Sequence, residues 1–160
     1  MQEYILRAAP VMAMNSMSMK QENIKGQAMK KKKVMIIDDN KEFTDELKEA
    51  LTLSGYDVTA ANDPTNAAGI AEKINPDVIL LDLKMPKKSG IHLAYELRQI
   101  DKLANVPIIA ISAFYKEGIF PIMKVHGITS YLSKPLDPNK VVAEIEKNLE
   151  SGEAPSKEYQ

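Results

Sequence analysis

This 160-residue chain lacks several features, and each absence argues against a class of function. It has no cysteine, so it has no disulfide framework, no thiol nucleophile and no thiolate metal site, which fits a reducing compartment such as the cytoplasm. No apolar run approaches the roughly 20 residues that span a bilayer. A net charge of -1 and a pI near 6.2 give no basic surface for nucleic acid. We therefore expect a cytoplasmic protein that binds neither nucleic acid nor a membrane directly.

The composition is that of one globular domain with two tails. Hydrophobic residues make up 44% of the chain and charged residues 27%, which is enough to build a single core. Residues 1–30 hold most of the methionines among polar residues without helical or strand periodicity, and they are predicted to form a disordered extension. Residues 150–160 carry glycine, proline and charge, which predicts a flexible tail. The folded domain is expected at 31–149.

From residue 33 onward, short apolar runs alternate with helix-length amphipathic stretches. This alternation is typical of repeated βα units and predicts an α/β fold, with a parallel sheet between two layers of helices. The strands are expected at residues 34–37, 56–61, 77–81, 106–111 and 128–132.

Proline placement predicts how the helices begin. Asp63 with Pro64, and Asp137 with Pro138, each have the pattern of an N-cap followed by proline at the first helical position. The helix expected after the fourth strand contains both Gly118 and Pro121. Either it starts late, with Pro121 in its first turn, or it is short and mobile.

Polar residues follow four of the five expected strands. They are Asp38 and Asp39 after the first strand, Asp82 after the third, Ser112 after the fourth and Lys134 after the fifth. In a parallel sheet these ends lie on one edge, so the side chains should converge. Local alternatives exist for each residue taken singly, since Asp38 and Asn40 could cap the first helix and Asp82 could close a turn.

The three carboxylates would repel one another at this edge, each pair by about 4 kcal/mol at ~4 Å and an effective dielectric of ~20. Lys134 supplies one positive charge, and Mg²⁺ suits the remaining oxygen ligands. An aspartate beside a cation favours phosphoryl transfer. Asp82 would be the nucleophile, and Asp38 and Asp39 would bind the metal ion. Lys134 would neutralise the charge of the phosphoryl oxygens, and the Ser112 hydroxyl would donate a hydrogen bond to them.

These motifs together resemble the receiver domain of two-component response regulators. The resemblance rests on Asp38-Asp39 after VMII, the ILLDLKMPKKSG segment around Asp82, Ser112-Ala113, and the YLSKP run from Tyr131 to Pro135. It implies a flavodoxin-like sheet of order 2-1-3-4-5, the strand order known for chemotaxis receivers. It also implies a phosphorylated Asp82, Mg²⁺ ligands at Asp39, Asp82 and the main-chain carbonyl of Lys84, and Asp38 acting through water.

The resemblance further implies a switch and a cis peptide. Ser112 and Tyr131 match the hydroxyl and aromatic positions that move together on phosphorylation, and the Lys134-Pro135 bond is expected to be cis. The phosphoryl group would come from a sensor histidine kinase or a histidine phosphotransfer protein. The phosphorylated form would bind a downstream target protein, unidentified from sequence, or a second copy of the chain as a homodimer.

The leading hypothesis is a single-domain response regulator that is not an enzyme with independent substrate turnover. No second domain is expected after Leu149, so output would pass through another protein. One alternative is a receiver-like scaffold that does not use phosphate. A second is an aspartate-nucleophile phosphatase of the haloacid dehalogenase type, although that family places its nucleophile after the first strand. The resemblance implies a signalling face built from the fourth helix, the fifth strand and the fifth helix. Pro121 and Gly118 depart from an ordinary fourth helix, and Lys84 puts a cation near the phosphorylated Asp82.

Overall fold

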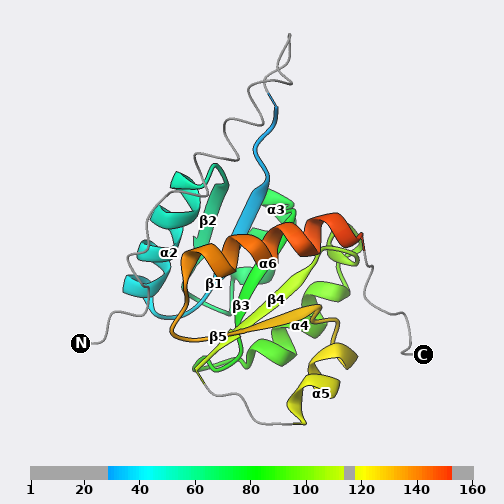
Figure 1. Ribbon diagram of the computed structural model, residues 1–160. Helices are drawn as coiled ribbons and strands as arrows, with labels where there is room; N and C mark the ends of the chain where they lie inside the picture. Colours follow the sequence, from blue (N-terminus) through cyan, green and yellow to red (C-terminus); the bar gives the residue numbers. More distant parts are fainter. Residues whose placement is uncertain (1–28, 114–117, 153–160) are drawn as a thin grey trace.

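The computed structural model describes residues 29–113 and 118–152 (Figure 1). Most of the extension expected at 1–30, and the tail expected at 150–160 beyond residue 152, lie outside these residues. The strands are β1 (Lys33–Ile37), β2 (Asp57–Ala61), β3 (Val78–Asp82), β4 (Ile108–Ser112) and β5 (Ser130–Ser133). The helices are α2 (Lys41–Leu53), α3 (Ala67–Ile74), α4 (Gly90–Arg98), the 3-10 helix η1 (Asp101–Leu103), α5 (Ile119–Val125) and α6 (Pro138–Ser151).

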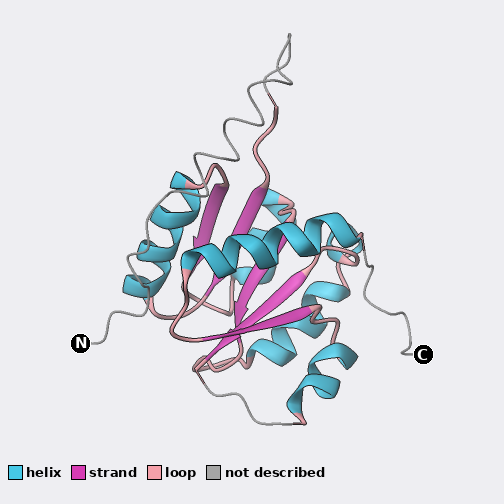
Figure 2. Ribbon diagram, in the orientation of Figure 1, coloured by secondary structure: helices cyan, strands magenta, loops and turns pink. Residues whose placement is uncertain are grey.

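The five strands form one sheet in the order β2-β1-β3-β4-β5, and every neighbouring pair is parallel. Helices α2 and α6 cover one face, and α3, α4 and α5 cover the other (Figures 1 and 2). The predicted three-layer, doubly wound fold and its strand order are therefore confirmed. Because all strands run the same way, their carboxyl ends share one edge.

The central strands β3 and β4 are formed by continuous apolar runs. Every residue of β3 and of β4 is buried, as expected where helices cover both faces of a parallel sheet. One core cluster packs under α3, α4 and α5, with Ile79 and Leu81 of β3 in it. The other packs under α2 and α6, with Val78 and Leu80 in it. Alternate residues of one strand thus anchor both layers and fix Asp82 at the strand's end.

Two of the predicted helix starts had different outcomes. Asp137 caps α6 by accepting a hydrogen bond from the main-chain N–H of Asn139, and Pro138 is the first helical residue, as predicted. The cap predicted at Asp63 with Pro64 was wrong, because α3 begins only at Ala67. The Asp63 carboxylate accepts instead from the N–H and hydroxyl of Thr65, at 2.9 and 2.6 Å. This local turn satisfies the carboxylate before a helix can begin.

Helix α5 begins late, so the first of the two alternatives for this region is confirmed. It spans seven residues, Ile119–Val125, and Pro121 lies in its first turn, where a helix loses no hydrogen bond to proline. Gly118 precedes it with a φ of 91°, in the left-handed region that glycine adopts without a steric penalty.

Arg98, the last residue of α4, ties together two connections at the edge of the sheet where the strands begin: the segment from α4 to β4 and the turn from α5 to β5. Its guanidinium donates hydrogen bonds to the main-chain oxygens of Leu103, Val106 and Gly127. Burial lowers the pKa of this guanidinium to about 10. Gly127 is required here, since a Cβ would come within 2.4 Å of Arg98 Nε. The contact fixes the turn between α5 and β5.

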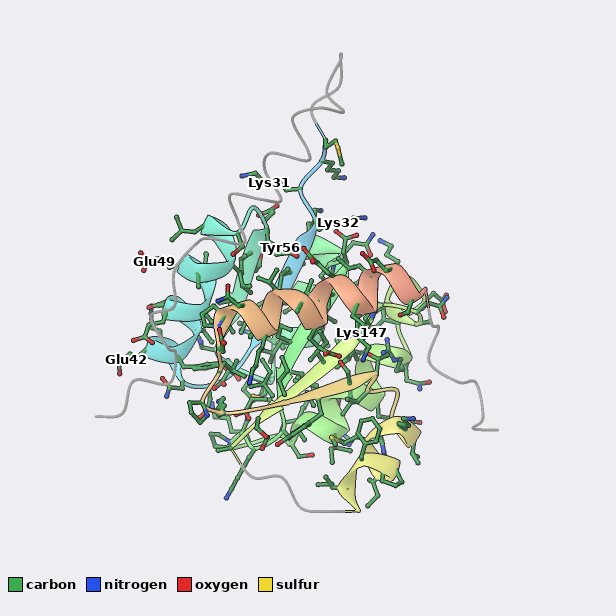
Figure 3. All side chains as sticks on the ribbon, in the orientation of Figure 1. Lys31, Lys32, Glu42, Glu49, Tyr56 and Lys147 are labelled. Carbon is green, nitrogen blue, oxygen red and sulfur yellow. The ribbon has the colours of Figure 1, made fainter. Side chains whose placement is uncertain are left out.

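The outer face of α2 carries charged residues. Glu42 and Glu49, for example, point outward from α2 (Figure 3). Within the described residues, none of the helices has the length and apolar character needed to cross a membrane.

Candidate functional site

The acidic pair after β1 divides into a buried and an exposed carboxylate. Asp38 is 2% exposed, and its Oδ2 accepts a hydrogen bond from Lys134 Nζ at 2.6 Å. Its Oδ1 accepts a hydrogen bond from the main-chain N–H of Asn40 at 2.9 Å, which closes a local turn before α2. Asp39 is exposed. Asn40 caps α2 by accepting from the N–H of Phe43, and the helix start thereby holds the pair in place.

Asp82 lies at the end of β3, between β1 and β4 in the sheet. Asp82 is buried, with 6% of its surface exposed. Its Oδ1 accepts a long hydrogen bond, 3.4 Å, from the main-chain N–H of Lys84. The carboxylate therefore sits at the centre of the edge on which the sequence predicted it.

The three carboxylates converge as the strand-end argument predicted. Ligand oxygens of Asp38, Asp39 and Asp82 all lie within 4.8 Å of one another. Burial, and next the negative charge of Asp38, raise the pKa of Asp82 to about 6. Burial also raises the pKa of Asp38, against the lowering effect of its hydrogen bond with Lys134. A cluster of hard oxygen donors with this excess of negative charge fits a divalent cation of the Mg²⁺ type.

Lys134 and Ser112 reach the same cleft from β5 and β4. Ser112 is 3% exposed, and its main-chain oxygen accepts a hydrogen bond from the N–H of Lys134 at 2.9 Å. The Lys134-Pro135 peptide is cis. The cleft has a volume of about 240 Å³. Its lining residues are Asp38, Asp39, Asn40, Phe43, Asp82, Lys84, Ser112, Ala113 and Lys134.

Tyr131 on β5 contacts the end of β4. Its hydroxyl donates a hydrogen bond to the main-chain oxygen of Ser112 at 3.3 Å and accepts one from Ser133 Oγ at 3.3 Å. Tyr131 and Ser112, the two residues that the sequence paired as a switch, are therefore in direct contact.

One lining residue was missed as a member of the site. Phe43 of α2 was not among the predicted site residues, yet its ring lies against the ammonium of Lys134, 4.2 Å from centroid to Nζ. The signal available in the sequence was its position, in the first turn of the helix that directly follows the acidic pair.

Residues 34–146 match the sequence family described as the response regulator receiver domain. The chain belongs to this receiver family. A curated relative, the polar-differentiation response regulator DivK of Brucella anthropi, is 30% identical over 118 residues. Those residues are 74% of this chain and 96% of the relative. Receiver domains of this family act in two-component signalling.

Solved receiver structures are similar in fold. The chemotaxis protein CheY4 of Vibrio cholerae has a TM-score of 0.71 at 25% identity, covering 74% of this chain and 98% of that one. The receiver domain of a sensor histidine kinase from Pseudomonas aeruginosa has a TM-score of 0.69 at 26% identity, covering 76% and 99%. That domain was solved with a magnesium ion coordinated in its active site cleft. Membership of the receiver family argues against the aspartate-nucleophile phosphatase that was the second alternative from sequence.

Proposed function

We propose that this chain is a response regulator that accepts a phosphoryl group on Asp82, in the cytoplasm, from a sensor histidine kinase or a histidine phosphotransfer protein. The observation that carries the proposal is the convergence of Asp38, Asp39 and Asp82 at one end of the sheet, with Lys134 paired to Asp38 beside them. Capping alone would not gather a buried carboxylate, an exposed carboxylate and a cation around the end of the central strand.

Asp82 has the properties of the acceptor. With a pKa of about 6, its carboxylate is mostly ionised at neutral pH and its oxygen can attack phosphorus. A P–O bond forms to Asp82 while the donor's P–N bond breaks, and the histidine nitrogen keeps the electron pair. Lys134 and Ser112 line the same cleft, and their ammonium and hydroxyl would bind the oxygens of the transferred group.

Asp39, Asp82 and the main-chain carbonyl of Lys84 would hold Mg²⁺, with Asp38 acting through water. When bound, the cation supplies positive charge for the phosphoryl oxygens. Asp39 suits direct binding because it is exposed, whereas Asp38 is buried and already bonded to Lys134. Lys84 lines the cleft, and its main-chain N–H donates the long hydrogen bond to Asp82.

The output face would be formed by α5, β5 and α6. The hydrogen bond from Tyr131 to the Ser112 carbonyl supports this, because it links the cleft to β5. Ile122 and Val125 of α5 are 50% and 37% exposed, which suits binding of a target protein or a second copy of the chain. To drive such a switch from mostly off to mostly on, phosphorylation must favour the active state by about 5.5 kcal/mol.

The test is intact-protein mass after incubation with acetyl phosphate, with and without Mg²⁺. The wild-type chain should gain one phosphoryl group only with Mg²⁺, and Asp82→Asn should gain none. Asp101→Asn is the matched control, because Asp101 is an exposed carboxylate on η1 outside the cleft.

A folded wild-type protein that binds Mg²⁺ but gains no mass would support the phosphate-independent scaffold instead. Light scattering of the chain loaded with beryllium trifluoride, a stable phosphoryl mimic, would distinguish a homodimer from a form that awaits another protein.

A further inference from the structure

Two groups from the same segment contact the ammonium of Lys134. Asp38 Oδ2 accepts its hydrogen bond at 2.6 Å, and the face of the Phe43 ring lies 4.2 Å away from centroid to Nζ. The Lys134 side chain is only 11% exposed and Phe43 only 2%. The carboxylate and the ring therefore take the place of water around a largely buried cation.

These two contacts differ in their dependence on direction. A hydrogen bond to Asp38 fixes the orientation of one N–H of the ammonium, which has three. The attraction between a cation and a ring face depends on the position of the nitrogen, and it tolerates rotation of the N–H groups. One contact can thus persist while the other is rearranged.

The proposed phosphorylation requires such a rearrangement. A phosphoryl group on Asp82 would compete with Asp38 for the donors of Lys134. If Asp38 were the only restraint, the ammonium would lose its anchor when the hydrogen bond changed partner. An anchor that does not use the N–H groups removes this conflict.

We infer that Phe43 is a positioning residue for phosphoryl transfer: its ring holds the Lys134 nitrogen in place while the ammonium shares its hydrogen bonds between Asp38 and the phosphoryl group. The inference rests on the proposed function. The ring is itself held firmly, because the Phe43 N–H bonds to the Asn40 side chain and the side chain packs in the core beneath α2 and α6. A leucine at this position would fill much of the space without the negative ring face.

Fluorinated phenylalanines at position 43 test the electrostatic role with little change in shape. The rate constant for Mg²⁺-dependent phosphorylation by acetyl phosphate should fall stepwise through mono-, tri- and pentafluorinated rings, by about tenfold in total. The rate constant of Phe43→Leu should be as low as that of the protein with the pentafluorinated ring. Leu51→Ala is the control for stability alone, because Leu51 is fully buried on the same helix but does not line the cleft.

A second measurement follows the contact itself. The ε-methylene protons of Lys134, assigned with Lys134→Gln, should show a ring-current upfield shift that disappears in Phe43→Leu and persists when beryllium trifluoride is bound. Loss of the upfield shift on loading, or a rate independent of fluorination, would overturn the role of Phe43 alone. A wild-type chain that is never phosphorylated would overturn the proposed function, and this role with it.

Discussion

Gly90 packs directly against the main chain of Asp82. A Cβ at Gly90 would come within 2.1 Å of the Asp82 carbonyl oxygen and 2.7 Å of Leu83 Cα. The Gly90 N–H also donates to the Leu83 carbonyl at 3.0 Å, so the start of α4 closes the loop onto the end of β3. The position of Asp82 therefore depends on a residue eight positions later that has no side chain.

Gly90→Ala should destabilise the protein by about 3 kcal/mol, because the added methyl must displace main-chain atoms of Asp82 and Leu83. If Asp82 is phosphorylated as proposed, the same displacement should slow its phosphorylation more than tenfold. Urea unfolding and mass spectrometry measure the two effects. Gly69→Ala is the matched control: a Cβ there meets nothing within 4 Å, and the residue lies inside α3. It should raise stability by about 1 kcal/mol. Equal stability of the two variants would contradict the role given to Gly90.

The carboxyl of Asp82 should make stability depend on pH when a chelator removes divalent ions. Its pKa is raised to about 6 in the folded protein from 3.8, so the folded state binds this proton more tightly than the unfolded state. The resulting stabilisation is present below about pH 4 and is lost as the pH rises through about 6.

The free energy of unfolding of Asp82→Asn should not show this fall with rising pH. Above about pH 6 the variant should be more stable than wild type by about 2 kcal/mol, allowing for solvent screening at the cleft. Urea unfolding of both proteins across this range measures the difference. Wild-type and mutant curves that stay parallel would show that the raised pKa of Asp82 has no such effect.

Removing Lys134 should expose the cost of burying Asp38. Lys134→Met leaves a carboxylate that is 2% exposed without its cation, and we expect a loss of about 3 kcal/mol at neutral pH. The double variant Asp38→Asn with Lys134→Met should recover at least about 1 kcal/mol of that loss. Chemical unfolding of the wild type, the single variants Asp38→Asn and Lys134→Met, and the double variant gives the coupling energy. Strictly additive effects would argue against a stabilising pair.

Mg²⁺ should stabilise the wild-type protein by about 1.4 kcal/mol at a concentration tenfold above its Kd. Asp39→Asn should fold normally, because Asp39 is exposed, and should show little of this stabilisation. Thermal unfolding in a Mg²⁺ titration provides the comparison, with KCl at matched ionic strength as control. An equal shift in KCl would mean that the carboxylates respond to salt and not to a specific cation.

Sequence could predict the place of Asp38, Asp39, Asp82, Ser112 and Lys134, because each lies at or just after the end of an expected strand and parallel strands end at one edge. It could not predict contacts that depend on tertiary distances. The Phe43 ring could be assigned to a buried helix face, but its approach to Lys134 depends on how α2 packs against the sheet. The same holds for Gly90, whose sequence context indicates only a loop, whereas in the structure the Asp82 carbonyl lies against it.

The error at Asp63 has a local cause. An aspartate followed by proline suits the start of a helix and a short turn equally, and the hydroxyl of Thr65 favours the turn. For Gly118 and Pro121 the pattern offered two outcomes, and only the structure showed that α5 starts after the glycine.

The hydrogen bond between Lys134 and Asp38 joins residues 96 positions apart in the sequence. During synthesis, β1, β3 and β4 all leave the ribosome before Lys134, whose ammonium is the cation of this pair. Since β5 joins the sheet through β4, a nascent chain cannot assemble the full charge arrangement until its last strand is in place. Under the proposed function, only a chain whose five-stranded sheet is complete could then be phosphorylated, and incompletely folded chains would not signal.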